Sequence, residues 1–318
     1  MHSALGPRLL TIGEIFDRAV HLTIANILPL VAIVGLVTVP IRAIGDWLDR
    51  DALNQSFSVD GKIVADPRLI ANYFTLIRDP HAHSTFWSGQ LWFFASLFPL
   101  SLAIAAASIA TQIFLNGEKA ELGAAYRSAL RRLGPIFGAT ILAWAAYLAA
   151  IIADILVVIA FWSIWFVVLK IAGGGTSAAP LAGIAAMMFS LFVAAIVWII
   201  PLGSCTTTGA ALYGIRPQRA IREAWEMTMS RGLRVRTLAF GAAFLALTVV
   251  QEFFRLVVCG LLSDVTHSTW LAFVASGAIT LLALIIGMAL AVVFYLDARN
   301  RVGLLQDPLA RRENSQSQ

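Results

Sequence analysis

The chain has 318 residues, of which 59% are hydrophobic and 13% are charged, and its mean hydropathy is +0.81. This composition excludes an ordinary soluble domain, because so few polar side chains cannot cover so much apolar surface in water. We therefore interpret the net charge of +5 through the positive-inside rule of membrane proteins, and not as a sign of nucleic-acid binding.

Six apolar segments are long enough to cross the ~30 Å hydrocarbon core of a bilayer. They are residues 24–44, 91–115, 135–171, 179–203, 237–262 and 269–296. The third is too long for one crossing and barely long enough for two. Only one crossing keeps the arginine-rich stretches 127–132 and 216–236 on the same side of the membrane, so residues 161–171 are expected either to extend the third span or to lie in the outer interface.

The segments predict an all-α fold, a polytopic membrane helix bundle with six transmembrane helices in a single domain, 1–318. Six crossings place both termini in the cytoplasm, and most of the 23 Lys and Arg residues then fall in cytoplasmic segments. No small-residue cleavage site follows the first segment, so we expect it to be retained. Residues 45–90 are predicted to form an outer loop, and residues 310–318 a disordered tail.

A short amphipathic helix precedes the first, third and fifth spans. The three copies lie near residues 12–20, 122–130 and 217–226, and in each the apolar positions follow the spacing of one helical stripe. A break follows each copy: "ANILP", "LGP" and "MSRG". We predict three repeats of an amphipathic helix plus a helical hairpin, over about 8–117, 118–214 and 215–301.

The charged positions of these helices predict contact with anionic lipid headgroups, because an amphipathic helix in the interface plane directs its arginines toward phosphates. The candidate residues are Arg18, Arg127, Arg131, Arg132, Arg219 and Arg222. Two alternatives stay open. The helices can pack against each other as a cytoplasmic collar, or a soluble partner can dock on them.

Three ionisable residues interrupt the spans: Asp154 in the third, and Glu252 and Arg255 in the fifth. Intramembrane charges are costly and often functional, so these residues are candidates for substrate or ion contact. The alternatives are a solvated carboxylate at the outer boundary for Asp154, and a structural ion pair for Glu252 and Arg255, which are three residues apart on one helix face.

No motif for catalysis or cofactor binding is present. The sequence contains no phosphate loop, nucleotide fingerprint or nucleophile elbow, and the imidazoles of "DPHAH" (79–83) lack further ligands for a metal. The two cysteines lie in or beside apolar runs and are interpreted as packing residues. We therefore predict no enzyme activity, no cofactor and no metal site.

Three stretches resemble a bacterial family. They are "TIGEIFDRAVHL" (11–22), "AIREAWEMTMSRGLRVRTL" (220–238) and "FYLDARNR" (294–301), the last containing a Tyr-x-Asp-x-Arg-x-Arg motif at Tyr295, Asp297, Arg299 and Arg301. They are similar to uncharacterised multi-span proteins related to the membrane domain of glycerophosphoryl diester phosphodiesterases. The resemblance implies six spans in a bacterial cytoplasmic (inner) membrane, and it implies no hydrolysis, because this chain has no room for the soluble phosphodiesterase domain.

These observations lead to two functional hypotheses. The first is a non-enzymatic inner-membrane protein, a lipid-contacting or membrane-assembly component of the envelope that works through its basic amphipathic helices. The alternative is a transporter or channel for a small or amphiphilic substrate, with a cavity between the repeats. The expected partners are membrane lipids, anionic ones above all, and a second copy or another membrane protein; nucleic acid is not expected.

Overall fold

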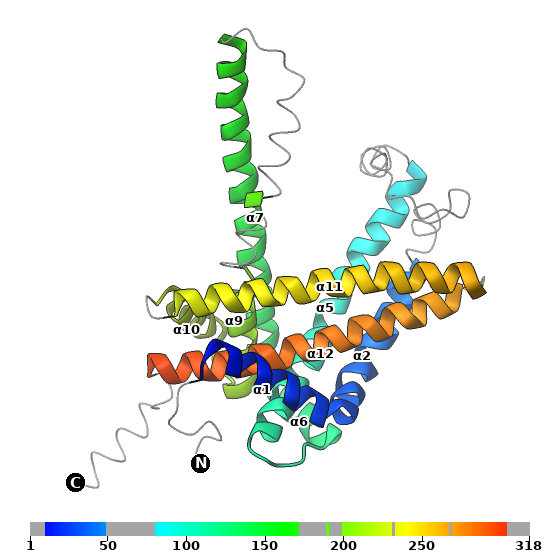
Figure 1. The fold of residues 1–318 in the computed structure, drawn as a ribbon, viewed down its shortest axis with the longest axis vertical. Coiled ribbons are helices and arrows are strands. Elements are labelled where there is room, and N and C mark those ends of the chain that lie inside the picture. The colour runs from blue at the N-terminus through cyan, green and yellow to red at the C-terminus, as the bar shows by residue number, and fades with distance from the viewer. Residues whose placement is uncertain are drawn as a thin grey trace. The chain divides into compact units, whose positions relative to one another are not determined.

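The structure is a computed structural model that describes residues 10–48, 80–171, 189–190, 199–230, 233–266 and 269–303. The elements in these ranges are all helices (Figure 1). They are α1 (Ile12–Ala25), α2 (Ile27–Leu48), α5 (Pro80–Leu115), α6 (Leu122–Arg131), α7 (Leu133–Ile171), α9 (Ile200–Tyr213), α10 (Pro217–Met229), α11 (Arg234–Thr266) and α12 (Thr269–Val302). The predicted all-α class is confirmed for this part of the chain.

Four of the described helices contain a segment that is long and apolar enough to cross a membrane. The segments are Ala95–Leu115 in α5, Leu133–Ala150 in α7, Arg234–Gln251 in α11 and Val274–Val302 in α12. Helices α1 and α2 provide a fifth if they form one broken span. Four of the six predicted spans thus correspond to such a segment. The first, 24–44, does so only if α1 and α2 form one broken span, and 179–203 lies mostly outside the described residues.

The boundary between α1 and α2 lies at Asn26, where the chain bends by 82°. The Asn26 side-chain amide donates a hydrogen bond to the carbonyl of Leu22 at 3.0 Å, which satisfies one of the carbonyls left open at the end of α1. Pro29 follows in the first turn of α2, where its missing N–H costs nothing. The "ANILP" break predicted after the first amphipathic helix is therefore present.

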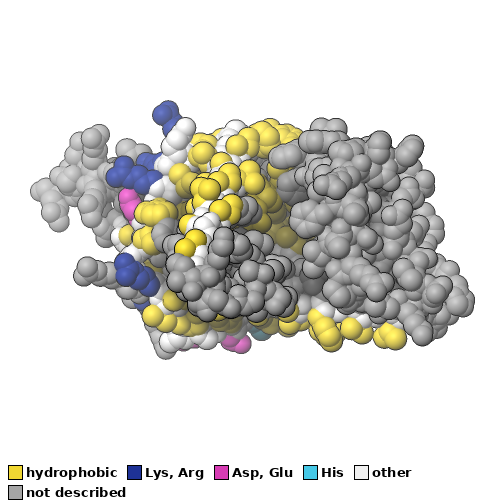
Figure 2. All heavy atoms as spheres, turned by 90° about the horizontal axis from the view of Figure 1, so that it is seen from above, with side chains coloured by type: hydrophobic (Ala, Val, Ile, Leu, Met, Phe, Trp, Pro, Cys, Tyr) yellow, Lys and Arg dark blue, Asp and Glu magenta, His cyan; other side chains and the backbone are white. Residues whose placement is uncertain are grey.

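The outward surface of α7 is apolar over most of its length. Its exposed large side chains recur along the helix and are Ile141, Leu148, Ile152, Leu156, Ile159 and Val167. Figure 2 shows the same tendency over the described surface that it draws, where hydrophobic side chains are the majority and charged ones are few. Such a surface would cause aggregation in water, and it suits contact with lipid chains.

The structure differs from the sequence prediction at two places, the outer loop and the end of the third span. Helix α2 continues to Leu48 and α5 begins at Pro80, so helices extend into both ends of the predicted 45–90 loop. Helix α7 is continuous to Ile171, so residues 161–171 prolong the helix of the third span. Residues 49–79 and the predicted tail, 310–318, lie outside the described residues.

The chain divides into two compact units, and each has its own core. The first comprises Met1–Phe16, Gly134–Leu245 and Ala291–Gln318. At its centre is the last third of α12, where Val292, Val293 and Phe294 are buried. The Phe294 ring stacks on Phe240 of α11 with ring centroids 4.4 Å apart, so aromatic packing holds these two helices together.

Helices α9 and α10 of the first unit are joined by a three-residue turn. Gly214 ends α9 in the left-handed conformation, with φ +62°, and its N–H bonds to the carbonyl of Ala210 at 2.9 Å. Pro217 then begins α10 at a position that needs no N–H donor. A small-residue core of Ala139, Ala210 and Ala220 joins α7, α9 and α10.

The second unit comprises Asp17–Leu133 and Ala246–Leu290. Its core is built on the alanine-rich part of α5, in which Ala103, Ala106 and Ala110 are fully buried. Small side chains allow close helix approach, which is the usual source of helix association in lipid. Helix α6 packs against α5 and places Ala125 and Ala129 in this core.

We predict that Gly138→Ala destabilises the first unit. A Cβ at Gly138 would lie 2.5 Å from Cγ of Pro217, a ring carbon that cannot swing away, and overpacking of this kind costs about 1–3 kcal/mol. Gly134→Ala on the same helix is the matched control, because nothing lies within 4 Å of its added Cβ. Thermal unfolding in detergent should show a lower midpoint for Gly138→Ala only; equal midpoints would contradict this packing.

Candidate functional site

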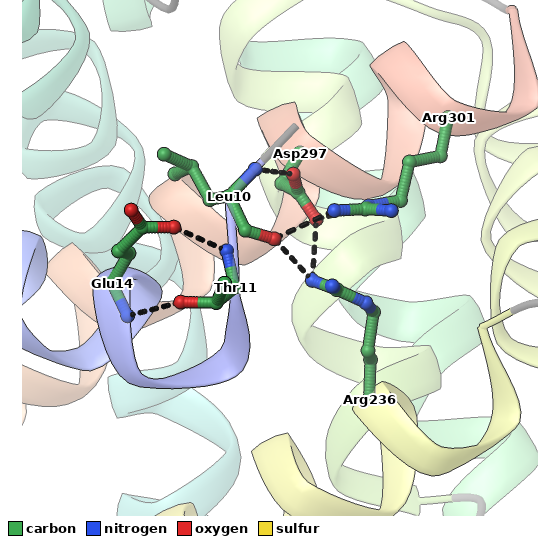
Figure 3. Close-up of polar contacts among 6 residues, drawn as sticks. All are labelled: Leu10, Thr11, Glu14, Arg236, Asp297 and Arg301. Atoms are coloured by element: carbon green, nitrogen blue, oxygen red, sulfur yellow. Dashed lines mark hydrogen bonds and ion pairs between the residues drawn. The ribbon is translucent and has the colours of Figure 1, made fainter. Parts of the chain in front are cut away.

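The densest polar arrangement in the first unit surrounds the backbone of Leu10, immediately before α1 (Figure 3). Leu10 donates its N–H to Oδ1 of Asp297 at 3.1 Å. Its carbonyl accepts hydrogen bonds from Nη1 of Arg236 and from Nη2 of Arg301, both at 2.6 Å. We call Arg236, Asp297 and Arg301 the Leu10 clamp, because together they hold both backbone polar groups of one residue.

The clamp is also an ion-pair network. Oδ2 of Asp297 lies 2.8 Å from Nε of Arg301 and 3.3 Å from Nη1 of Arg236. The Asp297 side chain is only 3% exposed, and each arginine is 19% exposed. A carboxylate this deeply buried needs cationic partners and hydrogen-bond donors, and it has two guanidinium groups and a backbone N–H. The clamp therefore joins α11, α12 and the start of α1.

A capping box adjoins the clamp at the first turn of α1. The Thr11 N–H donates to Oε2 of Glu14 at 2.6 Å, and the Glu14 N–H donates to Oγ1 of Thr11 at 3.2 Å. This reciprocal arrangement satisfies two of the four N–H groups that every helix start leaves open. Thr11 and Glu14 form the Thr-x-x-Glu signal of a capping box directly before an apolar stripe, so the sequence alone could predict this helix start.

The alternating motif at the end of α12 has a geometric explanation. Residues four apart share a helix face, so Tyr295 and Arg299 lie on one side of α12, while Asp297 and Arg301 lie on the other. Asp297 and Arg301 belong to the Leu10 clamp. On the other side, the Arg299 guanidinium lies 3.8 Å from the ring centroid of Tyr213 on α9, and the Tyr213 and Tyr295 rings pack at 6.2 Å.

The three predicted intramembrane residues are not tested by this geometry. Asp154 belongs to α7, and Glu252 and Arg255 belong to α11, but their side chains lie outside the part that the structure describes. Nothing described brings them to a common site. The hypothesis of a transporter or channel, which depends on these residues, stays a prediction.

Helix α6 has the clearest separation of an inner and an outer face. Ala125 and Ala129 are fully buried, whereas Arg127 and Arg131 are exposed. The Tyr126 hydroxyl donates to the carbonyl of Ile33 on α2 at 2.6 Å, and burial raises the pKa of this phenol, which keeps the donor protonated. This bond sets the rotation of α6 about its axis, and so determines which residues point outward.

The sequence of α6 contains no acidic residue, and no ion pair joins Arg127 or Arg131 to another residue that the structure describes. Arg132, at the C-terminal cap of α6, is half-buried. In α1, Arg18 is also half-buried, beside the buried Ala19. The strongest exposed positive surface on the three amphipathic helices is therefore that of Arg127 and Arg131.

Helix α10 has a similar pattern in sequence but a different electrostatic state. Nε of Arg219 lies 2.8 Å from Oε1 of Glu223, and Nε of Arg222 lies 3.1 Å from Oε1 of Glu226. Arg219 and Arg222 are 64% and 81% exposed, yet each has a glutamate one turn away that neutralises it. Trp225 is exposed on the same helix, a residue type common at membrane interfaces.

No protein-family model, curated protein or solved structure matches the chain.

We predict that Asp297→Asn destabilises the protein strongly. The neutral amide would leave two largely buried guanidinium groups without a counter-charge, and removing one partner of a buried ion pair costs about 3–5 kcal/mol. Glu226→Gln, which removes one partner of an exposed pair on α10, is the control and should cost less than about 1 kcal/mol.

Thermal unfolding in detergent should separate Asp297→Asn from Glu226→Gln, and limited proteolysis should cut Asp297→Asn faster near Leu10, because the clamp no longer holds that backbone. If both variants unfold at the wild-type temperature with the same proteolysis rate, the clamp does not stabilise the fold.

Proposed function

We propose that the protein is a non-enzymatic, multi-pass component of a bacterial cytoplasmic membrane that contacts anionic lipids through its cytoplasmic-side amphipathic helices. It would act in lipid contact or membrane assembly within the cell envelope. The observation that carries this proposal is the outward face of α6, where Arg127 and Arg131 are exposed on a helix without any acidic residue.

The position of α6 in the chain supports lipid as the partner. Helix α6 ends at Arg131 and α7 begins at Leu133, and the first stretch of α7 is one of the four segments able to cross a membrane. An arginine two residues before a membrane-crossing helix lies at the level of the headgroups. Each Lys or Arg near an anionic membrane surface contributes about 1 kcal/mol of attraction.

The exposed apolar side chains of the amphipathic helices support the same partner. Leu122 and Leu130 on α6 and Val20 and Ile24 on α1 are exposed, although each helix also buries a separate set of apolar residues. A helix that exposes both arginines and large apolar side chains suits an interface with phosphates on one side and acyl chains on the other. Helix α10, with its paired charges, would then contribute through Trp225 more than through its arginines.

Six spans, three repeats and two cytoplasmic termini belong to this proposal. The predicted topology places Asn314 inside the cell and Gly174, in a predicted outer turn, outside. Single cysteines at these two positions, in a background of Cys205→Ala and Cys259→Ser, should therefore react with a membrane-impermeant maleimide from opposite sides of the membrane. Labelling from the same side would contradict the topology.

We predict that Arg131→Glu together with Arg132→Glu lowers anionic lipid binding by about tenfold or more, since two attractive charges become repulsive. The measurement is the amount of phosphatidylglycerol that the purified, immobilised protein retains from mixed micelles with phosphatidylcholine. Arg311→Glu with Arg312→Glu makes the same change in net charge in the C-terminal tail and serves as the control. Unchanged retention in the α6 variant, or an equal drop in both, would contradict the proposal.

A further inference from the structure

We infer that Arg127 and Arg131 form a discrete site for one phosphate group of an anionic phospholipid, held between the two guanidinium groups on the outward face of α6. This inference rests on the proposed function and makes it narrower: it replaces a diffuse positive surface with a site of defined residues, geometry and stoichiometry.

The two arginines are placed to share one ligand. They are four residues apart on a helix, so their Cβ atoms lie about 5–6 Å from each other on the same face. That face is opposite the one buried through Ala125 and Ala129, and both arginines are exposed on it. The bond from Tyr126 to the Ile33 carbonyl holds α6 in this rotation, so the site is organised before any ligand binds.

The electrostatics of α6 favour an anion between the two side chains. Like charges four residues apart repel and destabilise a helix, and α6 provides no carboxylate to relieve this repulsion. In helix α10 the positive charges are instead neutralised, because each exposed arginine pairs with a glutamate four residues further along the helix. A phosphate oxygen can accept from both guanidinium groups, and arginine is the side chain best suited to such bidentate bonds.

The surroundings favour a phospholipid over a free phosphate ion. Leu130, 53% exposed, lies next to Arg131 on α6, and Leu122 is exposed at the start of the helix. These side chains offer an apolar surface for the glycerol backbone and upper acyl chain of a lipid, which inorganic phosphate cannot use. The membrane-crossing part of α7 begins directly after α6, so the ligand is available where the site lies.

The test uses the full-length protein in detergent and measures retention of phosphatidylglycerol over a range of lipid concentrations. Arg127→Lys with Arg131→Lys keeps both charges but removes the forked donors, and Arg127→Gln with Arg131→Gln removes the charges. Arg311→Lys with Arg312→Lys, the same double change in the C-terminal tail, is the control. Arg127 and Arg131 are both exposed, and thermal unfolding should verify that each variant is folded.

We expect the wild-type protein and the variant Arg311→Lys with Arg312→Lys to saturate with the same apparent Kd. The double Lys variant should bind about three- to tenfold more weakly, and the double Gln variant more than tenfold more weakly. Addition of 10 mM inorganic phosphate should displace little of the bound lipid.

Two results would overturn the inference in different ways. If the double Lys variant binds like the wild type, attraction is diffuse; the discrete site is then wrong, while the proposed function stands on the result with Arg131→Glu and Arg132→Glu. If inorganic phosphate displaces the lipid at equal concentration, the site binds a soluble anion. Unchanged binding in the double Gln variant and in the charge-reversal variant together would reject both the site and the proposed function.

Discussion

The burial of one carboxylate, that of Asp297, is the constraint on which the first unit depends. Asp297 lies near the end of an apolar helix, at 3% exposure, where an unpaired charge would be prohibitively costly. Two segments that are distant in sequence supply partners, the backbone at Leu10 and Arg236 on α11, and Arg301 adds a third from the next turn of α12 itself. The packing around the C-terminal end of α12 therefore has to neutralise and hydrogen-bond one buried carboxylate.

The same end of α12 is held from its other face by aromatic contacts. The Arg299 guanidinium lies over the Tyr213 ring of α9, and the Tyr295 ring packs against Tyr213, so α9 stabilises this guanidinium group. The other two residues of the motif, Asp297 and Arg301, belong to the Leu10 clamp. A short alternating sequence thereby connects α9, α11 and the start of α1 to one helix. In the part of the chain that the structure describes, Asp297, Arg299 and Arg301 of this motif hold α12 to Leu10, α9 and α11.

The amphipathic helices α6 and α10 show how similar sequence patterns can have different roles. Both have an apolar stripe with arginines on the other face. In α10 the glutamates at the fourth positions neutralise the arginines, and Glu223 is itself largely buried, at 8% exposure. In α6 the positive charge is uncompensated along the helix and lies directly before a segment that is long and apolar enough to cross a membrane. The two helices therefore differ in how far their arginines are neutralised, although their sequence patterns are similar.

The sequence by itself determined the helical class, the location of the apolar helices and the positions of the three amphipathic helices, because hydropathy and helical periodicity are local properties. The breaks at Asn26, Arg132 and Ser230 could also be predicted, since caps, prolines and charge shifts mark them within a few residues. Only the tertiary structure decided that Leu10, Arg236 and Asp297 meet, and that Tyr126 of α6 bonds to the Ile33 carbonyl of α2. These contacts join residues far apart in the chain, and no local pattern encodes the partner of a buried charge.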